Sequence, residues 1–183
     1  MKLIGALVAV GAALLATVAI AAAGGGLSSE QRAVKQATVR YQSVGAAEAA
    51  GYVRSSPCEE SPAGAMGYHY VNAALAGDLA VDPLRPEVLL YAPKEDGELR
   101  LVGVEYFVVA LANTPSGPAP WFGASPPPGG FFNPAPTLFG RSFDGPMAGH
   151  GPGMPWHYDL HAWVWRHNPS GTLAQWNPLV HCS

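Results

Sequence analysis

Two apolar segments joined by a short polar turn constrain the fold of this 183-residue chain more than any other feature. Residues 87–92 and 99–109 are rich in leucine, β-branched and aromatic residues, and Asp96-Gly97 lies in the polar segment between them. Asp-Gly between two such segments is typical of a β-hairpin with a two-residue turn. The sequence therefore predicts an antiparallel hairpin here.

The turn also predicts which residues of the hairpin share a face. With this turn, Val88 faces Glu105 across the hairpin. Tyr91 faces Val102, on the opposite face. Leu101 lies on the same face as Glu105. Both faces are mostly apolar, so other parts of the chain must cover both of them.

An amphipathic helix is predicted over residues 28–45. The motif Ser28-x-x-Gln31 fits a capping box at its start. Val34 and Tyr41 belong to an apolar stripe with three- and four-residue spacing. A short second helix is expected at 46–50. This helix, or helix pair, is expected to pack on one face of the hairpin.

Further strands and a long loop complete the predicted fold. Residues 66–71 form a plausible strand. The turn sequence 168–171 lies between 156–166 and 172–176 and predicts a second hairpin. Residues 113–155 hold most of the prolines and predict a long Pro/Gly-rich loop. We expect an α+β fold, in which the N-terminal helices cover a curved antiparallel sheet or small barrel built from two hairpins.

The beginning of the chain predicts export. Met1-Lys2 precedes the apolar residues 3–22, and small residues follow, an order typical of a secretory signal peptide. We expect residues 1–23 to be removed and residues 24–183 to form a single globular domain that is secreted or lies in the cell envelope. A retained anchor is the alternative, because about 20 apolar residues can span a bilayer. Membrane contact is expected only through this segment.

Cysteine usage agrees with an extracytoplasmic location. Cys58 and Cys182 are the only cysteines of the chain. An oxidising compartment favours their pairing. We expect a disulfide that ties the C-terminus to the segment after the first helices.

The charge balance argues against nucleic acid as a partner. The formal net charge is −3, and only 13% of the residues are charged. A chain of this composition has no basic face with which to bind phosphates. The expected partner is therefore a small ligand or a metal ion.

Histidine and carboxylate residues concentrate near the end of the chain. If residues 157–165 form a strand, His157, Asp159 and His161 share one face. Strand residues four apart are separated by about 13 Å, so the two histidines cannot share one ion without a bulge. Asp159 can join either of them. A helix that begins at Pro155 is the alternative, and it would place both histidines one turn apart; the many aromatic residues favour the strand.

Further ligands must come from other strands. His69 and Glu105 are the natural candidates, each on another predicted strand. Histidine and carboxylate ligands suit Zn, Fe, Mn or Cu, and the sequence does not choose among these metals. The alternative is that these groups only hydrogen-bond to backbone or to each other. His150, between two glycines, is expected to be a lid residue or an exposed loop residue.

Several segments carry a resemblance to a known group of proteins. They are Ala49-Ala-Gly-Tyr52, Met66-Gly-Tyr-His-Tyr-Val-Asn72, Leu101-Val-Gly-Val-Glu-Tyr106, His157-Tyr-Asp-Leu-His-Ala-Trp163, Asn168-Pro-x-Gly171 and Trp176-Asn-Pro178. With these segments the chain resembles a group of uncharacterised secreted bacterial proteins with no assigned activity. The resemblance implies export and a single domain, and it implies no mechanism.

Binding of a divalent metal is the function that the sequence favours, with or without a small metal-dependent reaction. The alternative is a non-catalytic extracellular binding module that uses the aromatic and histidine face to bind a sugar, peptide or cell-wall fragment. A purely structural envelope protein is the third reading. The sequence does not decide whether the protein is an enzyme. Convergence of His69, Glu105 and the 157–161 side chains would favour the metal.

Overall fold

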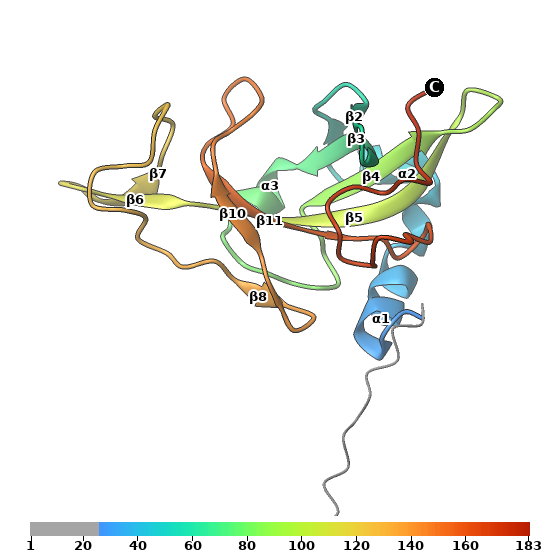
Figure 1. Ribbon diagram of the computed structural model, residues 1–183, viewed down its shortest axis with the longest axis horizontal. Helices are drawn as coiled ribbons and strands as arrows, with labels where there is room; N and C mark the ends of the chain where they lie inside the picture. Colours follow the sequence, from blue (N-terminus) through green and yellow to red (C-terminus); the bar gives the residue numbers. More distant parts are fainter. Residues whose placement is uncertain (1–25) are drawn as a thin grey trace, which may run out of the picture.

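The computed structural model describes residues 26–183, and most of its regular structure is antiparallel sheet (Figure 1). Seven strands form one sheet in the order β1-β3-β4-β5-β11-β10, with β2 paired to β3. The predicted signal segment, residues 1–23, lies outside the described residues. The sheet is open, so the small barrel considered as an alternative is wrong.

The strands of the large sheet are β1 (Tyr52–Arg54), β2 (Glu59–Ser61), β3 (Gly64–Asn72), β4 (Val88–Pro93), β5 (Leu99–Val109), β10 (Asp144–Met147) and β11 (His157–Ala162). Two small sheets pair β6 (Leu111–Thr114) with β7 (Gly117–Pro120) and β8 (Thr137–Leu138) with β9 (Arg141–Ser142). β6 and β7 form an arm that extends beyond the end of β5 (Figure 1). The helices are α1 (Ser29–Ala37), the 3-10 helix η1 (Val39–Gln42), α2 (Val44–Ala49) and α3 (Ala73–Ala76).

The N-terminal helical segment begins as predicted but is broken twice. Ser28 and Gln31 form the capping box, each side chain accepting the other's backbone N–H, at 3.1 and 3.0 Å. α1 then ends at Ala37, and the hydroxyl of Thr38, its C-cap, donates to the Val34 carbonyl. Ser43 adopts extended backbone and caps α2. A single helix to residue 45 is therefore wrong, because Thr and Ser hydroxyls compete for backbone groups inside the predicted span.

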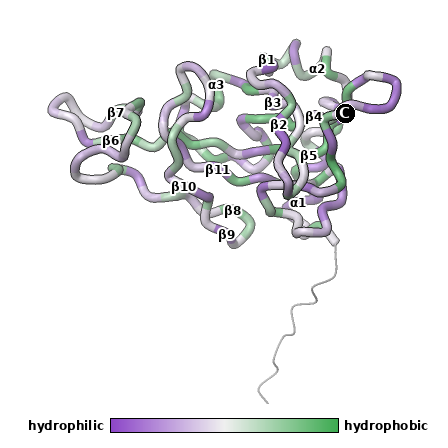
Figure 2. The backbone as a smooth tube through the Cα atoms, turned by 45° about the horizontal axis from the view of Figure 1, so that its top comes forward, coloured by the Kyte–Doolittle hydropathy of each residue, from purple (hydrophilic) through white to green (hydrophobic). Residues whose placement is uncertain are grey.

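The predicted β4–β5 hairpin is present, with a different turn. Lys94 and Glu98 are bonded across a three-residue loop that ends at Gly97, whose φ is 82°. This turn shifts the pairing by one residue, so Tyr91 faces Leu101 rather than Val102. The loop is hydrophilic, whereas the central strands are largely hydrophobic (Figure 2).

A bulge farther along β5 restores the predicted register. The pairing slips by one residue between Tyr91 and Leu90, so that Val88 faces Glu105 as expected. Between the turn and the bulge, Leu101 and Val102 exchange faces relative to the prediction. A one-residue slip has this effect because successive strand residues point to opposite faces.

The second predicted hairpin is wrong. β11 pairs with β5 and β10, and residues 172–176 form no strand. The β10 partner comes from residues 113–155, the predicted long loop, which also contains β7, β8 and β9. Trp163 still donates its backbone N–H to Thr172 O and its indole N–H to Ala174 O. The C-terminal segment therefore folds back as a series of turns, which the two hydrogen bonds from Trp163 fix beside the end of β11.

The two faces of the large sheet are covered by different elements. One buried cluster combines Val34 and Tyr41 of the helical segment with Leu89 and Tyr91 of β4. The Tyr91 hydroxyl donates to the Tyr41 carbonyl at 2.5 Å. The other face carries a smaller cluster, made of Ala65, Val88, Leu90, Ala92, Val102, Phe107, Val109, Trp163 and Val180.

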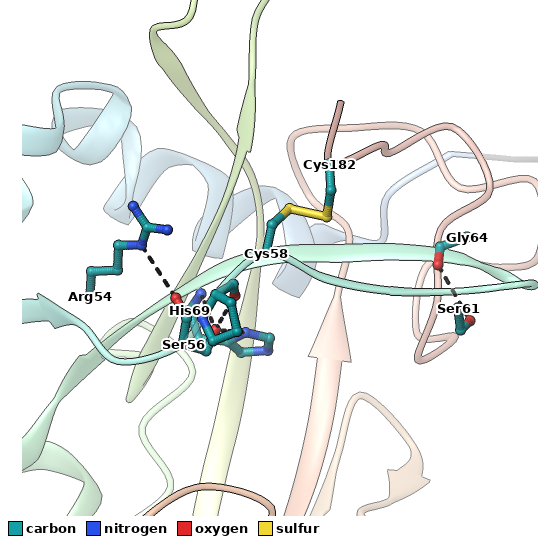
Figure 3. Close-up of a disulfide and its surroundings, with 8 residues drawn as sticks. Arg54, Ser56, Cys58, Ser61, Gly64, His69 and Cys182 are labelled. Atoms are coloured by element: carbon teal, nitrogen blue, oxygen red, sulfur yellow. Dashed lines mark hydrogen bonds between the residues drawn. A yellow bond between two sulfur atoms is a disulfide. The ribbon is translucent and has the colours of Figure 1, made fainter.

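The predicted disulfide is confirmed. Cys58 and Cys182 are bonded across a sequence separation of 124 residues. The bond joins the segment before β2 to the C-terminal segment (Figure 3). Cys182 packs against the smaller cluster. Such a bond suits an oxidising, extracytoplasmic environment. Within residues 26–183, no helix has the length and apolar character needed to cross a membrane.

Replacement of both cysteines by alanine is expected to lower the free energy of unfolding by about 2–5 kcal/mol, because the bond restricts the unfolded chain. Urea denaturation of the oxidised wild type and the variant measures this. The reduced wild type should match the variant. Equal midpoints for oxidised wild type and variant would contradict the assigned role.

Candidate metal centre

Three strands bring His69, Glu105 and His161 to one place on the sheet. His161 of β11 lies directly opposite Glu105 of β5. On the other side of Glu105, β4 presents the short side chain of Val88. The longer imidazole of His69, on β3, reaches across β4 to the carboxylate. The strand interpretation of 157–162 is thereby confirmed, and the helix that begins at Pro155 is wrong.

The distances within this His/Glu/His cluster approach those of a metal site. His69 Nε2 lies 3.2 Å and His161 Nε2 lies 3.8 Å from Glu105 Oε2. One ligand atom from each of the three residues lies within 4.8 Å of the other two. Two atoms bound to one ion at about 2.1 Å lie about 3–3.5 Å apart. Small side-chain movements would therefore suffice for coordination.

Several polar atoms of the cluster are buried without a hydrogen-bond partner. Both ring nitrogens of His161 have none among the described residues. Glu105 Oε2 has no hydrogen-bond partner there beyond its ion-pair contact with His69 Nε2 at 3.2 Å. His161 is 1% exposed, so water does not replace the missing partner from outside. A buried polar group without a partner costs free energy, and native proteins rarely leave several together. The cluster therefore has the character of a ligand site.

Ser56 orients His69. Its hydroxyl donates to the Pro57 carbonyl and lies 3.1 Å from His69 Nδ1 (Figure 3). Because the single hydroxyl proton is used in the first bond, Ser56 Oγ accepts from the Nδ1–H of His69. The lone pair of a neutral His69 is then on Nε2, directed toward Glu105. Metal-binding histidines are commonly oriented in this way by a second hydrogen bond.

Glu105 and His161 have shifted pKa values. Burial raises the pKa of Glu105, but the surrounding histidines lower it by more, so the carboxyl is ionised at pH 7. Burial lowers the pKa of His161 to about 4, despite the nearby Glu105 carboxylate, so this ring is neutral at pH 7. A carboxylate and a neutral imidazole are the protonation states that a metal ion requires.

His157 and Asp159, also predicted as ligands, lie outside the three-residue group. The Nδ1 of His157 bonds to the Pro155 carbonyl at 3.0 Å, and its ring stacks on Phe107. Burial raises the pKa of Asp159 to about 8, and the charges of Glu105 and Asp144 add to this. Alternate positions of β11 share a face, but their spacing along the strand keeps His157 apart from His161.

A cavity of about 690 Å³ opens beside the cluster. His69 and Glu105 form part of its wall, and His150 lies in the loop that forms another part. The His150 ring is 5.3 Å from the His157 ring. His150 is an exposed loop residue, as the second of its two predicted roles requires, and a lid role stays a prediction.

The tryptophans do not form the exposed aromatic face expected beside the histidines. Trp163 is buried, with its ring 6.4 Å from that of His161. Trp165 lies in the cluster on the other face, where its indole N–H donates to Thr38. The backbone leaves the strand after Ala162, so Trp163 and Trp165 do not continue the alternation of His157, Asp159 and His161.

Two buried or site-supporting residues, Ser56 and Glu87, were not identified from the sequence. Ser56 precedes Pro57 in a loop, and no spacing rule relates it to His69. Glu87 is 1% exposed, and its carboxylate accepts the backbone N–H of Phe107 at 3.1 Å. Its position at the start of an apolar strand was the only available signal of burial.

Comparison with known proteins adds no assignment. No family model matches the chain, and no curated protein or solved structure is significantly similar to it. The resemblance to secreted bacterial proteins therefore stays a prediction.

Glu87 should make stability depend on pH. Burial raises its pKa to about 8. The native state therefore holds this proton up to about that pH, whereas the unfolded state releases it near pH 4.5, so stability falls as pH rises between these values. We expect Glu87→Gln to be more stable than wild type at pH 9 by more than about 2 kcal/mol.

Urea denaturation of metal-free protein at pH 5, 7 and 9 measures this difference. Glu95→Gln, at an exposed position in the β4–β5 loop, is the control and should follow wild type. A constant difference between Glu87→Gln and wild type at all three pH values would show that Glu87 ionises normally.

Proposed function

We propose that this protein binds one divalent metal ion through His69 Nε2, the Glu105 carboxylate and His161 Nε2. The observation that carries the proposal is the meeting of these buried groups, in which both ring nitrogens of His161 have no hydrogen-bond partner among the described residues. An ion would supply a partner for a His161 ring nitrogen and a positive charge beside the Glu105 carboxylate. Ser56 supports the same reading, since it leaves the His69 lone pair free to coordinate.

Two histidines and one carboxylate form a donor set that suits Zn, Fe, Mn or Cu. Structural zinc sites usually have four protein ligands, whereas sites that do chemistry keep a position open. Here His69 and Glu105 lie at the wall of a cavity, with His161 beside them, and the cavity leaves space for a further ligand. We therefore infer an open metal site, suited to a small metal-dependent reaction or to ligand binding.

We place this site outside the cytoplasm. The disulfide Cys58–Cys182 supports this location, because such bonds persist in oxidising compartments. The predicted signal peptide at residues 1–23 supports it independently. The metal would then be acquired in the cell envelope or the surrounding medium.

Metal analysis of protein purified without an affinity tag tests the proposal. After dialysis against Zn²⁺, Fe²⁺, Mn²⁺ or Cu²⁺, wild type should hold about one ion per chain of at least one of these metals. His161→Ala and Glu105→Gln should bind at least tenfold more weakly. His167→Ala, at an exposed histidine, is the matched control and should bind as wild type does.

Circular dichroism in EDTA establishes that each variant is folded, and Glu105→Gln preserves side-chain shape if His161→Ala does not fold. Bound metal should also raise the unfolding midpoints of wild type and His167→Ala more than those of His161→Ala and Glu105→Gln. Metal content near zero in wild type, or equal content in wild type and both variants, would contradict the proposal.

Ser56→Ala should weaken metal binding about 10- to 100-fold, the range found when the hydrogen-bond partner of a metal ligand is lost. Ser56→Thr keeps the hydroxyl and should restore most of the affinity. Competition with a chromophoric chelator measures both. An unchanged affinity in Ser56→Ala would show that His69 needs no such support.

A further inference from the structure

The cavity beside the proposed metal ligands has mostly apolar walls. Its described lining residues come mainly from β1, β3, β4, β5 and α3, from the segment between β1 and β2, and from the loop between β10 and β11. Most are apolar, and none is lysine or arginine. Its volume of about 690 Å³ lies within the range of small-molecule sites.

The cavity extends from the metal ligands along one strand. Glu105, Phe107 and Val109 of β5 all face it, and they span about 13 Å by the rise of a strand. Glu105 lies at one end with His69. Met154 and His150, in the loop after β10, line the wall near the other end, where His150 approaches His157. The polar metal-binding end and the apolar body of the cavity are therefore separate.

The charge of the loaded site limits the head group that fits. Histidine coordinates as the neutral ring, so a divalent ion with the Glu105 carboxylate leaves one net positive charge. One anionic oxygen donor would neutralise it. A phosphate or other multiply charged group would need lysine or arginine, which the described lining lacks, and Glu59 would repel it.

We infer that this cavity binds a small apolar molecule with one monoanionic oxygen donor, such as a carboxylate or phenolate, which coordinates the metal. The inference rests on the proposed metal site. The donor completes the coordination of the ion, and the apolar body lies along Val88, Phe107 and Val109. Burial of that body supplies the affinity that a bare anion lacks.

Cobalt-loaded protein tests the ligand class, because the visible spectrum of Co²⁺ reports a new donor. 4-Phenylbutyrate should change the spectrum saturably and bind at least tenfold more tightly than acetate, which lacks the apolar body. The neutral 4-phenylbutyramide and the dianion phenylphosphonate should both bind at least tenfold more weakly than 4-phenylbutyrate.

A matched pair of variants locates the ligand. Ala73 and Ala74 are both exposed residues of α3, but only Ala73 lines the cavity. Ala73→Trp should keep its cobalt and lose at least tenfold in affinity for 4-phenylbutyrate, whereas Ala74→Trp should match wild type. Bound cobalt with no response to 4-phenylbutyrate, or equal affinity for acetate, would overturn the inference alone. Absence of bound cobalt would overturn the metal site as well.

Discussion

The pairing of β5 with β11 places a carboxylate and an imidazole face to face in an apolar sheet, and the rest of the site depends on this contact. Glu105 is almost fully buried, and an ionised carboxylate in such surroundings is costly without a partner of opposite charge. His161, its cross-strand neighbour, is neutral at pH 7 and does not supply that charge. His69 Nε2 lies 3.2 Å from the carboxylate on its other side, and a divalent ion bound by all three groups would supply the positive charge.

The two faces of the sheet differ in how they are covered. The helical segment packs Val34 and Tyr41 into the larger cluster, where tyrosine hydroxyls find backbone carbonyls. The other face is covered by loops, by α3 and by the C-terminal segment, which the Cys58–Cys182 bond ties down. Loops leave a cavity where a helix would fill the space. The disulfide compensates for part of the stability that a smaller cluster does not provide.

Local sequence patterns predicted several strands and helices, but they did not predict which distant strands pair in the sheet. Asp96-Gly97 located the hairpin, and alternation identified β11 with His157, Asp159 and His161 on one face. The strands that pair with β11 could not be predicted from the sequence, because β5 lies some fifty residues earlier and β10 lies within a Pro/Gly-rich segment. The candidate ligands His69 and Glu105 were named from strand predictions alone. Ser56 was missed, because its contact with His69 exists only in three dimensions.

Anomalous X-ray diffraction from a crystal of the metal-loaded protein tests the central claim most directly. The account predicts one anomalous peak at about 2.0–2.2 Å from a ring nitrogen of each histidine and from a Glu105 oxygen. It also predicts that the peak lies at the wall of the cavity, with a position open toward Phe107. A peak elsewhere, or imidazoles bonded only to the carboxylate in protein saturated with metal, would contradict it.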